Sequence, residues 1–427
     1  MKKAGSALLA GGMIALAMPG IGIGPLVFLC LVPLFFSMEK GRGFLPGFLA
    51  GTVFFAVDLR WLLALNRFTP LAIPGYLLLV GYLATHLGLF GLTVVWLKKP
   101  GREWTILILA PGCYTLLEML RAHGPLGIGF CALYQSLYHL PSLIQLTAIA
   151  GPWAITAAIV FINASLYLAV RKRPRYLLAG ITMIGLLAAF SLLPDTEDED
   201  SLSVAVISSS VSQEMKLNEQ NLDPLLKRYV KLGEEAKSYR PDLIIFPESI
   251  LPGHILQDTR LLNAFQDLAT TAGARVLFGT GDVRRGEIYN SVVLISPAGE
   301  VSGVYDMVHP VPFGEYIPAR GLFEWIGLVP LTGTFLPQDL ATGEGFEPID
   351  DIGALICFES TFPITTRRLT ANGARLLVAV TNDAWFAKSP EPKSHFAAAV
   401  FRAVESRRTL IQAANGGLSG IVDPRGR

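Results

Sequence analysis

The sequence predicts a multi-pass α-helical membrane bundle followed by an α/β domain, and contrasts within its 427 residues support this prediction. Hydrophobic residues make up 52% of the chain and charged residues only 16%, whereas soluble domains carry roughly 25% charged residues. Nearly all the acidic side chains follow Pro194. Beyond that residue, short β-branched runs alternate with helical patterns, which is typical of an α/β fold. A single large soluble core is therefore disfavoured.

Seven apolar stretches precede Pro194, and we expect them to form the membrane bundle. Their approximate bounds are 4–18, 24–36, 44–65, 72–97, 106–120, 143–170 and 176–193. The first two are shorter than the roughly 20 residues that cross a bilayer, so they are alternatively one broken hairpin that turns at Pro19-Gly20. A cleaved signal peptide over residues 1–18 is the competing interpretation. It is disfavoured because another apolar run follows Pro19-Gly20 directly and no small-x-small cleavage site is clear.

Basic side chains cluster at alternate ends of these stretches, which indicates an orientation. Eleven lie at the ends that we assign to the cytoplasm, namely Lys2, Lys3, Lys40, Arg42, Lys98, Lys99, Arg102, Arg171, Lys172, Arg173 and Arg175. The opposite ends carry only Arg60, Arg67 and Arg121. By the positive-inside rule the N-terminus is cytoplasmic. Seven crossings then place the residues after Pro194 on the outer face.

A charged pair, Glu118 and Arg121, lies where the fifth apolar stretch ends. Side chains three residues apart on a helix form ion pairs that serve only to satisfy each other, yet ionisable groups near membrane depth are often functional. The sequence leaves both interpretations open. The following loop, residues 123–130, is glycine-rich and apolar, which suits a segment that dips towards lipid.

After Pro194 we expect an acidic linker over residues 195–201 and then an alternation of strands and helices. Strands are predicted at 203–207, 242–246, 275–279, 289–295, 303–305, 354–357, 376–381 and 410–414. Helices are predicted at 224–239, 261–271, 363–371 and 395–408. A turn at 297–300 joins two of the strands into a hairpin. On the last helix, Arg402 and Glu405 are interpreted as a scaffolding ion pair.

Two side chains stand at the ends of predicted strands, where α/β domains place their chemistry. Glu248 follows the apolar run 243–246, and apolar surroundings raise a carboxyl pKa as a general base requires. Cys357 ends another predicted strand, and it is the one cysteine of the sequence after Pro194. Exported proteins usually pair their cysteines, so a lone thiol there indicates a reactive residue. A small buried hydrophobe is the alternative.

Several segments carry a resemblance to a known family. Residues 246–249, 304–316 and 355–360 resemble the three catalytic segments of the nitrilase superfamily, and 382–386, 401–406 and 413–417 match further signatures. With a bundle in front, the chain more narrowly resembles the apolipoprotein N-acyltransferase family over nearly its whole length. The resemblance implies a transmembrane bundle over 1–194 and a nitrilase-like αββα sandwich over 202–427. Family members continue past Arg427 with more sheet and a last span, so we expect the C-terminus to be truncated.

The resemblance assigns roles to three positions. Glu248 is implied to be the general base, and Cys357 the nucleophile that attacks an acyl ester of a membrane phospholipid to give a thioester. The amine of a diacylglyceryl-cysteine apolipoprotein then accepts the acyl chain. Met307 stands where the family carries a catalytic lysine, and a thioether offers no hydrogen-bond donor. Because one lost oxyanion donor typically lowers kcat by about 10²–10³, we expect Met307 to slow the reaction or abolish it.

Further side chains are implied to support this centre. Glu315 and Glu359 match carboxylates that position the catalytic groups, and Asn382 and Trp385 match residues that line the pocket. His309 is the nearest donor in the sequence that is able to replace the lysine, because no lysine neighbours position 307. The resemblance implies no metal ion and no cofactor.

The resemblance also places the chain in the bacterial inner membrane, as a multi-pass protein whose catalytic domain faces the periplasm. Its expected partners are a phospholipid acyl donor and an apolipoprotein acceptor. The net charge of +1 gives no indication of nucleic-acid binding. Two alternatives stay open: an inactive pseudoenzyme that binds lipid or lipoprotein, which Met307 favours, and another membrane-bound amidase of the nitrilase type.

Overall fold

The computed structural model describes residues 2–38, 41–98, 104–171, 173–192, 201–325, 327, 336, 338–386 and 388–427. The chain divides into two compact units. One contains Met1–Asp195, Lys388–Arg407 and Arg425–Arg427, and the other contains Thr196–Ala387 and Arg408–Pro424. We call them the helical unit and the α/β unit. Most of the predicted acidic linker, residues 195–200, lies outside the described residues.

The helical unit is built from the apolar stretches, some of which form one continuous helix and some of which are divided into shorter ones. Its elements are α1 (Lys2–Ala17), η1 (Gly24–Phe28), α2 (Val32–Ser37), α3 (Phe44–Asp58), η2 (Arg60–Arg67), α4 (Ala72–Leu97), α5 (Trp104–Arg121), η3 (Leu133–Leu137), α6 (Pro141–Ile144), α7 (Thr147–Ala150), α8 (Trp153–Val170), α9 (Arg175–Ala189), η4 (Phe190–Leu192) and α16 (Glu391–Ser406). The stretch predicted at 143–170 is divided, because Gly151 and Pro152 separate α7 from α8.

Three helices in the described part of the chain are long and apolar enough to cross a membrane, namely Ala72–Leu97, Trp153–Val170 and Arg175–Leu192. The pair Phe44–Asp58 and Arg60–Arg67, which is bent by 50°, makes a fourth if it is counted as one span. Shorter apolar helices lie at Lys3–Ala17, Gly24–Ser37 and Pro141–Ala150. The chain therefore has a helical half with membrane-spanning character, and the count of seven crossings stays a prediction.

Close backbone contacts hold the helices of this unit together. Helix α3 packs against α1 and α4. A Cβ atom added at Gly47 of α3 would lie 2.0 Å from the carbonyl oxygen of Leu87 in α4. Small residues permit such approaches between membrane helices. On α16, Arg402 Nε lies 2.8 Å from Glu405 Oε1, so the predicted scaffolding ion pair is confirmed.

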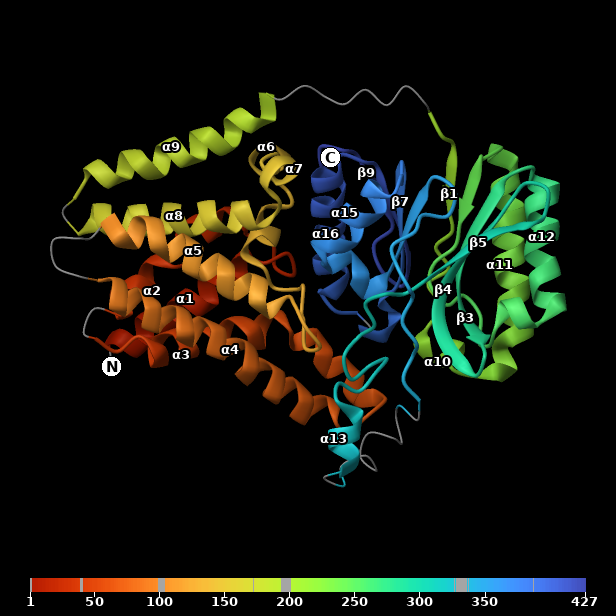
Figure 1. The fold of residues 1–427 in the computed structure, drawn as a ribbon, viewed down its shortest axis with the longest axis horizontal. Helices are drawn as coiled ribbons and strands as arrows, with labels where there is room; N and C mark the ends of the chain where they lie inside the picture. The colour runs from red at the N-terminus through yellow and green to blue at the C-terminus, as the bar shows by residue number, and fades with distance from the viewer. Residues whose placement is uncertain are drawn as a thin grey trace. The chain divides into compact units, whose positions relative to one another are not determined.

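The α/β unit contains two sheets, which Figure 1 shows between helices. The first has the order β1-β2-β3-β4-β5, and the second the order β6-β7-β8-β9. Their strands are β1 (Val204–Val206), β2 (Leu243–Ile245), β3 (Arg275–Arg284), β4 (Glu287–Ile295), β5 (Val301–Asp306), β6 (Ile352–Ile356), β7 (Leu376–Asn382), β8 (Leu410–Asn415) and β9 (Gly420–Val422). Strands β1 to β3 pair in parallel, as do β6 to β8, and the remaining pairs are antiparallel.

Helices cover both sheets. The helical elements of this unit are α10 (Gln213–Lys216), η5 (Glu219–Asn221), α11 (Leu222–Ala236), η6 (Lys237–Tyr239), η7 (Ile255–Gln257), α12 (Thr259–Ala272), α13 (Arg320–Trp325), η8 (Cys357–Thr361), α15 (Pro363–Ala371) and η9 (Asp383–Phe386). Helices α11 and α12 lie side by side on the outer face of the first sheet (Figure 1). Phe265 of α12 stacks on Phe278 of β3 at 4.8 Å between ring centroids. Helix α15 contacts β6, and β4 contacts β6 across the two sheets.

The predicted αββα sandwich is confirmed, and each strand and helix predicted after Pro194 has a counterpart. The hairpin around residues 297–300 is present, with β4 paired to β5. The sequence patterns missed a second hairpin, because β3 continues to Arg284 and pairs along its length with β4. They also missed β9 and the short helix α10. Parallel pairing brings the carboxyl ends of β1 and β2 to one edge, and it does the same for β6, β7 and β8.

Candidate active site

Glu248 lies in the turn that follows β2, and the residue is buried, at 7% exposure. The turn lies against β3, since a Cβ added at Gly279 would be 2.6 Å from the Cα of Glu248. Asn290 Nδ2 donates a hydrogen bond of 2.8 Å to Glu248 Oε1. Burial raises the pKa of Glu248, while the Asn290 amide, Lys216 and the Cys357 thiol oppose that rise. A buried carboxyl next to a thiol is suited to accept the thiol proton.

Cys357 stands at the point where β6 ends and η8 begins. It is partly exposed, and its backbone adopts the left-handed conformation with φ of +49°. Residues other than glycine rarely occupy this region, and the strain is typical of functional sites. The Cys357 thiol interacts with the Glu248 carboxylate, and a thiol next to a carboxylate is an arrangement that permits proton transfer between them.

Glu359, two residues further on, fixes the geometry of this turn. Its side chain is fully buried and accepts hydrogen bonds from the backbone N–H groups of Ile356 at 2.9 Å, Val308 at 2.7 Å and His309 at 3.2 Å. The Tyr305 hydroxyl adds a fourth at 3.1 Å. Burial raises the pKa of Glu359 to about 7, against these hydrogen bonds. Glu359 therefore joins the segment after β5 to the turn that carries Cys357.

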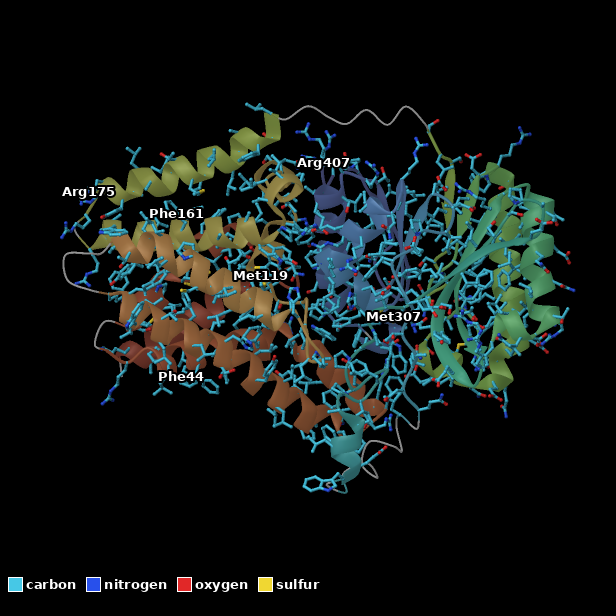
Figure 2. The ribbon with its side chains drawn as sticks, viewed as in Figure 1. Phe44, Met119, Phe161, Arg175, Met307 and Arg407 are labelled. Carbon is cyan, nitrogen blue, oxygen red and sulfur yellow. The ribbon has the colours of Figure 1, made fainter. Side chains whose placement is uncertain are left out.

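Met307 is 1% exposed and lies inside the α/β unit (Figure 2). Its Sδ atom is 3.9 Å from Asn290 Nδ2, and this amide donates both to Glu248 Oε1 and to Glu315 Oε1, the latter at 3.2 Å. Glu315 is held in turn by the backbone N–H of Val311 at 2.7 Å. Burial raises the pKa of Glu315 to about 7, and the charge of Glu248 adds to the rise. A neutral amide thus joins the two carboxylates beside position 307.

Lys216 of α10 is a residue that the sequence analysis did not identify. The residue is buried, at 6% exposure, and its ammonium donates a hydrogen bond of 2.9 Å to the backbone oxygen of Glu248. Burial lowers the pKa of Lys216 to about 8, and the charges of Glu248 and Cys357 counteract this effect. No lysine adjoins Met307 in the sequence, but one lies at the site in space. In the sequence, the signal that could have identified Lys216 was a lysine in the segment after the predicted strand 203–207.

The remaining predicted site residues are His309, Asn382 and Trp385, and each has different neighbours. The ring of His309 packs against the rings of Phe346 and Phe362, at 5.7 and 4.8 Å between centroids. Asn382 is buried; its Nδ2 donates to Gln213 Oε1 at 2.8 Å, and its Oδ1 accepts from Asn415 Nδ2 at 2.8 Å. Trp385 is partly exposed on η9. Asn382 therefore supports α10 through Gln213.

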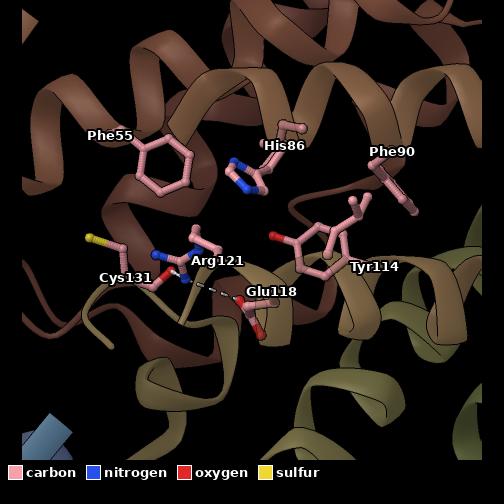
Figure 3. Close-up of a pocket in the computed structure, with 9 residues that line it drawn as sticks. Phe55, His86, Phe90, Tyr114, Glu118, Arg121 and Cys131 are labelled. Carbon is pink, nitrogen blue, oxygen red and sulfur yellow. Dashed lines mark hydrogen bonds and ion pairs between the residues drawn. The ribbon is translucent and has the colours of Figure 1, made fainter. Parts of the chain in front are cut away.

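The pair Glu118 and Arg121 lines a pocket in the helical unit with Phe55, His86, Leu87, Phe90, Tyr114, Leu117 and Cys131 (Figure 3). The Glu118 carboxylate accepts from the backbone N–H of Leu133 at 2.8 Å and from Thr156 Oγ1 at 2.7 Å. Arg121 donates to the carbonyl oxygens of Phe130 and Cys131 at 2.7 and 3.0 Å. These bonds tie the segment from Phe130 to Leu133 to α5, and the Thr156 hydroxyl ties the Glu118 carboxylate to α8.

The fold and the site define a class of protein: a carbon–nitrogen hydrolase sandwich with a cysteine, a buried glutamate and further carboxylates at the ends of its strands. Residues 205–427 match the carbon–nitrogen hydrolase family, and residues 10–165 match the apolipoprotein N-acyltransferase N-terminal domain.

Full-length relatives narrow this class. The chain is 31% identical to the apolipoprotein N-acyltransferase of Geobacter metallireducens, over 98% of this chain and 85% of the relative. It is 31% identical to that of Agrobacterium fabrum, over 100% of this chain and 87% of the relative. The chain belongs to the apolipoprotein N-acyltransferase family.

Solved structures share smaller parts of the chain. An amidase from Nesterenkonia sp. is 19% identical with a TM-score of 0.40, over 53% of this chain and 84% of the amidase. A carbon–nitrogen hydrolase from Helicobacter pylori is 17% identical with a TM-score of 0.38, over 53% of this chain and 83% of the hydrolase.

Proposed function

We propose that this chain transfers an acyl chain from a membrane phospholipid, through a thioester on Cys357, to the N-terminal amine of a diacylglyceryl-cysteine apolipoprotein. The similarity to apolipoprotein N-acyltransferases along 98% of the chain carries the proposal. The Cys357 thiol in contact with the Glu248 carboxylate supports it at the level of chemistry. Because relatives with this activity match the helical unit as well, an amidase is not favoured.

The proposed reaction has two steps in which Glu248 carries the proton. In the first, Glu248 takes the proton of Cys357, the sulfur attacks the ester carbonyl carbon, and the C–O bond breaks. The lysophospholipid leaves with the proton from Glu248, and a thioester remains. In the second, the amine attacks the thioester, the C–S bond breaks, and the amine's proton returns through Glu248 to the sulfur. Each step forms an oxyanion that hydrogen-bond donors must stabilise.

Trapping the thioester tests the proposal. The full chain in membranes is incubated with a phospholipid that carries a fluorescent acyl chain, and label on the protein is measured before and after neutral hydroxylamine. We expect hydroxylamine-labile label on Cys357 and none on Cys357→Ala. Addition of a diacylglyceryl-cysteine peptide then moves the label to the peptide amine. If no label forms on the folded wild-type protein, the result would instead support the pseudoenzyme. If the acyl chain is released to water or ammonia, the result would support an amidase.

We also propose that the α/β unit faces the periplasm of a bacterial inner membrane, with about seven spans in front of it. The distribution of eleven basic residues against Arg60, Arg67 and Arg121 supports this orientation. Reporter fusions or protease cleavage at residues 196–200 measure it directly, and we expect the outer side. Protection of this segment from external protease in intact spheroplasts, with cleavage after lysis, would contradict the orientation and the proposed substrates together.

A further inference from the structure

The carboxylates around Cys357 disfavour a negative charge on its sulfur, and position 307 holds a methionine where the family resemblance implies a lysine. Glu248 and Glu315 are joined through one amide, and Asp383 also acts on Glu248 as a like charge. Transfer of the Cys357 proton to Glu248 moves the negative charge to sulfur. Burial and neighbouring carboxylates oppose a thiolate, whereas a nearby cation lowers a thiol pKa. Met307 carries no charge and no donor.

Lys216 is the cation that the fold brings to this place. Its ammonium contacts the turn of Glu248 through the 2.9 Å hydrogen bond to the backbone oxygen, and its charge acts on both Glu248 and Cys357. An ammonium has three N–H donors, and this hydrogen bond occupies one of them. Among the described residues, no carboxylate oxygen forms an ion pair with Lys216 within 4.0 Å. The charge is therefore not neutralised by a dedicated partner.

A network of buried amides holds the helix that carries Lys216. Asn415 at the end of β8 donates to the Val211 oxygen at 2.8 Å and accepts from the Val211 N–H at 2.8 Å. Asn415 also donates to Asn382, which donates to Gln213 on α10. Residues from the ends of β7 and β8 thus fix the segment that begins α10. Because its helix is held in this way and its side chain is already buried, Lys216 loses little conformational freedom when it interacts with a charged thiolate.

We propose that Lys216 supplies the positive charge that stabilises the Cys357 thiolate, a charge that Met307 cannot provide. The proposal rests on the proposed function only in taking Cys357 as the nucleophile. No bond of Lys216 forms or breaks: the proton passes from Cys357 Sγ to Glu248, and the ammonium stays protonated beside the new thiolate. Since the pKa of Lys216 is lowered to about 8, this charge is present at neutral pH and is lost as the pH rises past about 8.

A purely structural role is the alternative, since the ammonium also anchors the Glu248 turn. Two substitutions distinguish the effect of the hydrogen bond to the Glu248 backbone oxygen from the effect of the positive charge. Lys216→Gln keeps a donor for the Glu248 oxygen but removes the charge, and Lys216→Arg keeps both. Lys237→Gln is a matched control, because Lys237 donates to Thr271 on the surface of the same unit. A double variant, Lys216→Gln with Met307→Lys, restores a cation at position 307.

The experiment measures the second-order rate of Cys357 alkylation by iodoacetamide between pH 5 and pH 10, on the full chain in detergent. Peptide mass spectrometry resolves Cys357 from the partly exposed Cys113, and Cys357→Ala provides the blank. Melting temperature shows whether each variant is folded. Alkylation needs no acyl donor, so failure of acyl transfer leaves this readout intact.

We expect Lys216→Gln to move the thiolate titration upward by about one pH unit and to lower the rate at pH 7 about tenfold, as one unit of pKa implies. Lys237→Gln should keep the wild-type profile, and Lys216→Arg should keep it below pH 8, where Lys216 itself is charged. Met307→Lys should return the profile of Lys216→Gln towards that of the wild type. An unchanged profile in folded Lys216→Gln would overturn the proposal. If Lys216→Gln does not fold, Lys216→Arg is tested instead. A shifted titration profile in Lys216→Arg that is not corrected by adding Met307→Lys would then overturn the proposal.

Discussion

Two buried clusters of charge in this protein differ in how completely their polar atoms are satisfied. In the helical unit, Glu118 accepts from a backbone N–H and a threonine hydroxyl, and Arg121 lies 3.8 Å away while donating to two carbonyl oxygens. In the α/β unit, Glu248 and Glu315 take hydrogen bonds from one shared amide. Among the described residues, Glu248 Oε2 has no hydrogen-bond partner, and the Cys357 thiol interacts with the Glu248 carboxyl group.

This difference separates a structural use of buried charge from a chemical one. A buried ion pair with all its hydrogen bonds made is stable only while both partners are present. A buried carboxylate with an unused oxygen and a raised pKa is poised to take up a proton. The burial of Glu118 and of Glu248 is similar, at 4% and 7% exposure. The two clusters therefore differ in whether their polar atoms have hydrogen-bond partners, and not in how deeply they are buried.

Glu248→Gln should have the largest effect on reactivity, because it removes the unused oxygen that accepts the proton. We expect acyl transfer and Cys357 labelling by an acyl phosphonate at neutral pH to fall by about 10²–10⁴, the usual contribution of a general base. Labelling rate and melting temperature are measured on the same preparation. Glu118→Gln is the matched control, with a lower melting temperature and an unchanged labelling rate in the folded fraction. Equal Cys357 labelling in wild type and Glu248→Gln would remove Glu248 from the role.

Met307→Lys should raise turnover, since the site forms an oxyanion twice per cycle and the thioether donates nothing. Methionine and lysine are both unbranched and similar in length, and Glu248 and Glu315 lie near enough to compensate the new ammonium. We expect thioester formation to rise by about 10²–10³, and Met307→Leu to give no gain. Wild-type turnover equal to the lysine variant would show that another donor carries the oxyanion. No gain on an inactive background would favour the pseudoenzyme.

Arg121→Met should change stability instead of chemistry. The substitution leaves the Glu118 carboxylate buried without its cation and frees the carbonyl oxygens of Phe130 and Cys131. Breaking a buried pair in this way costs about 3–5 kcal/mol of folding free energy. Thermal unfolding in detergent measures the loss, and iodoacetamide labelling of Cys357 in the folded fraction should match the wild type. A labelling rate that fell with stability intact would give this pair a part in the reaction.

Asn290→Leu should have the smallest effect, on the pH profile. The Asn290 amide stabilises the ionised form of Glu248, so its removal raises the Glu248 pKa further. Ionised Glu248 is the base, and the acid limb of the labelling profile should therefore move to higher pH, with about a tenfold lower rate on that limb. Ser291→Ala, at the neighbouring position of β4 where the hydroxyl bonds Asp306, is the control. An acid limb that stays in place would mean that Asn290 does not set the Glu248 charge.

Much of the α/β fold was predictable because its signals are local. The run 243–246 is apolar and ends at Pro247, and the helix over 363–371 begins at a proline and has the predicted bounds. The bundle was predictable as apolar helices, and the break at Gly151-Pro152 has a local signal in those two residues. The 50° bend between α3 and η2 contains no proline or glycine and has no such local signal. Helix α10 has four residues, too few for a periodic pattern, and so it escaped prediction.

The class of fold, the positions of Glu248 and Cys357 at strand ends and the methionine at position 307 were all predictable, because they follow from local patterns and residue identity. Which groups meet at the site depends on how the whole chain folds. It brings Lys216 to the oxygen of a residue 32 positions away and places one Asn290 amide between two carboxylates. Hydrogen bonds and charges act over a few ångströms, and sequence spacing does not encode such distances between segments that pack only after the chain has folded.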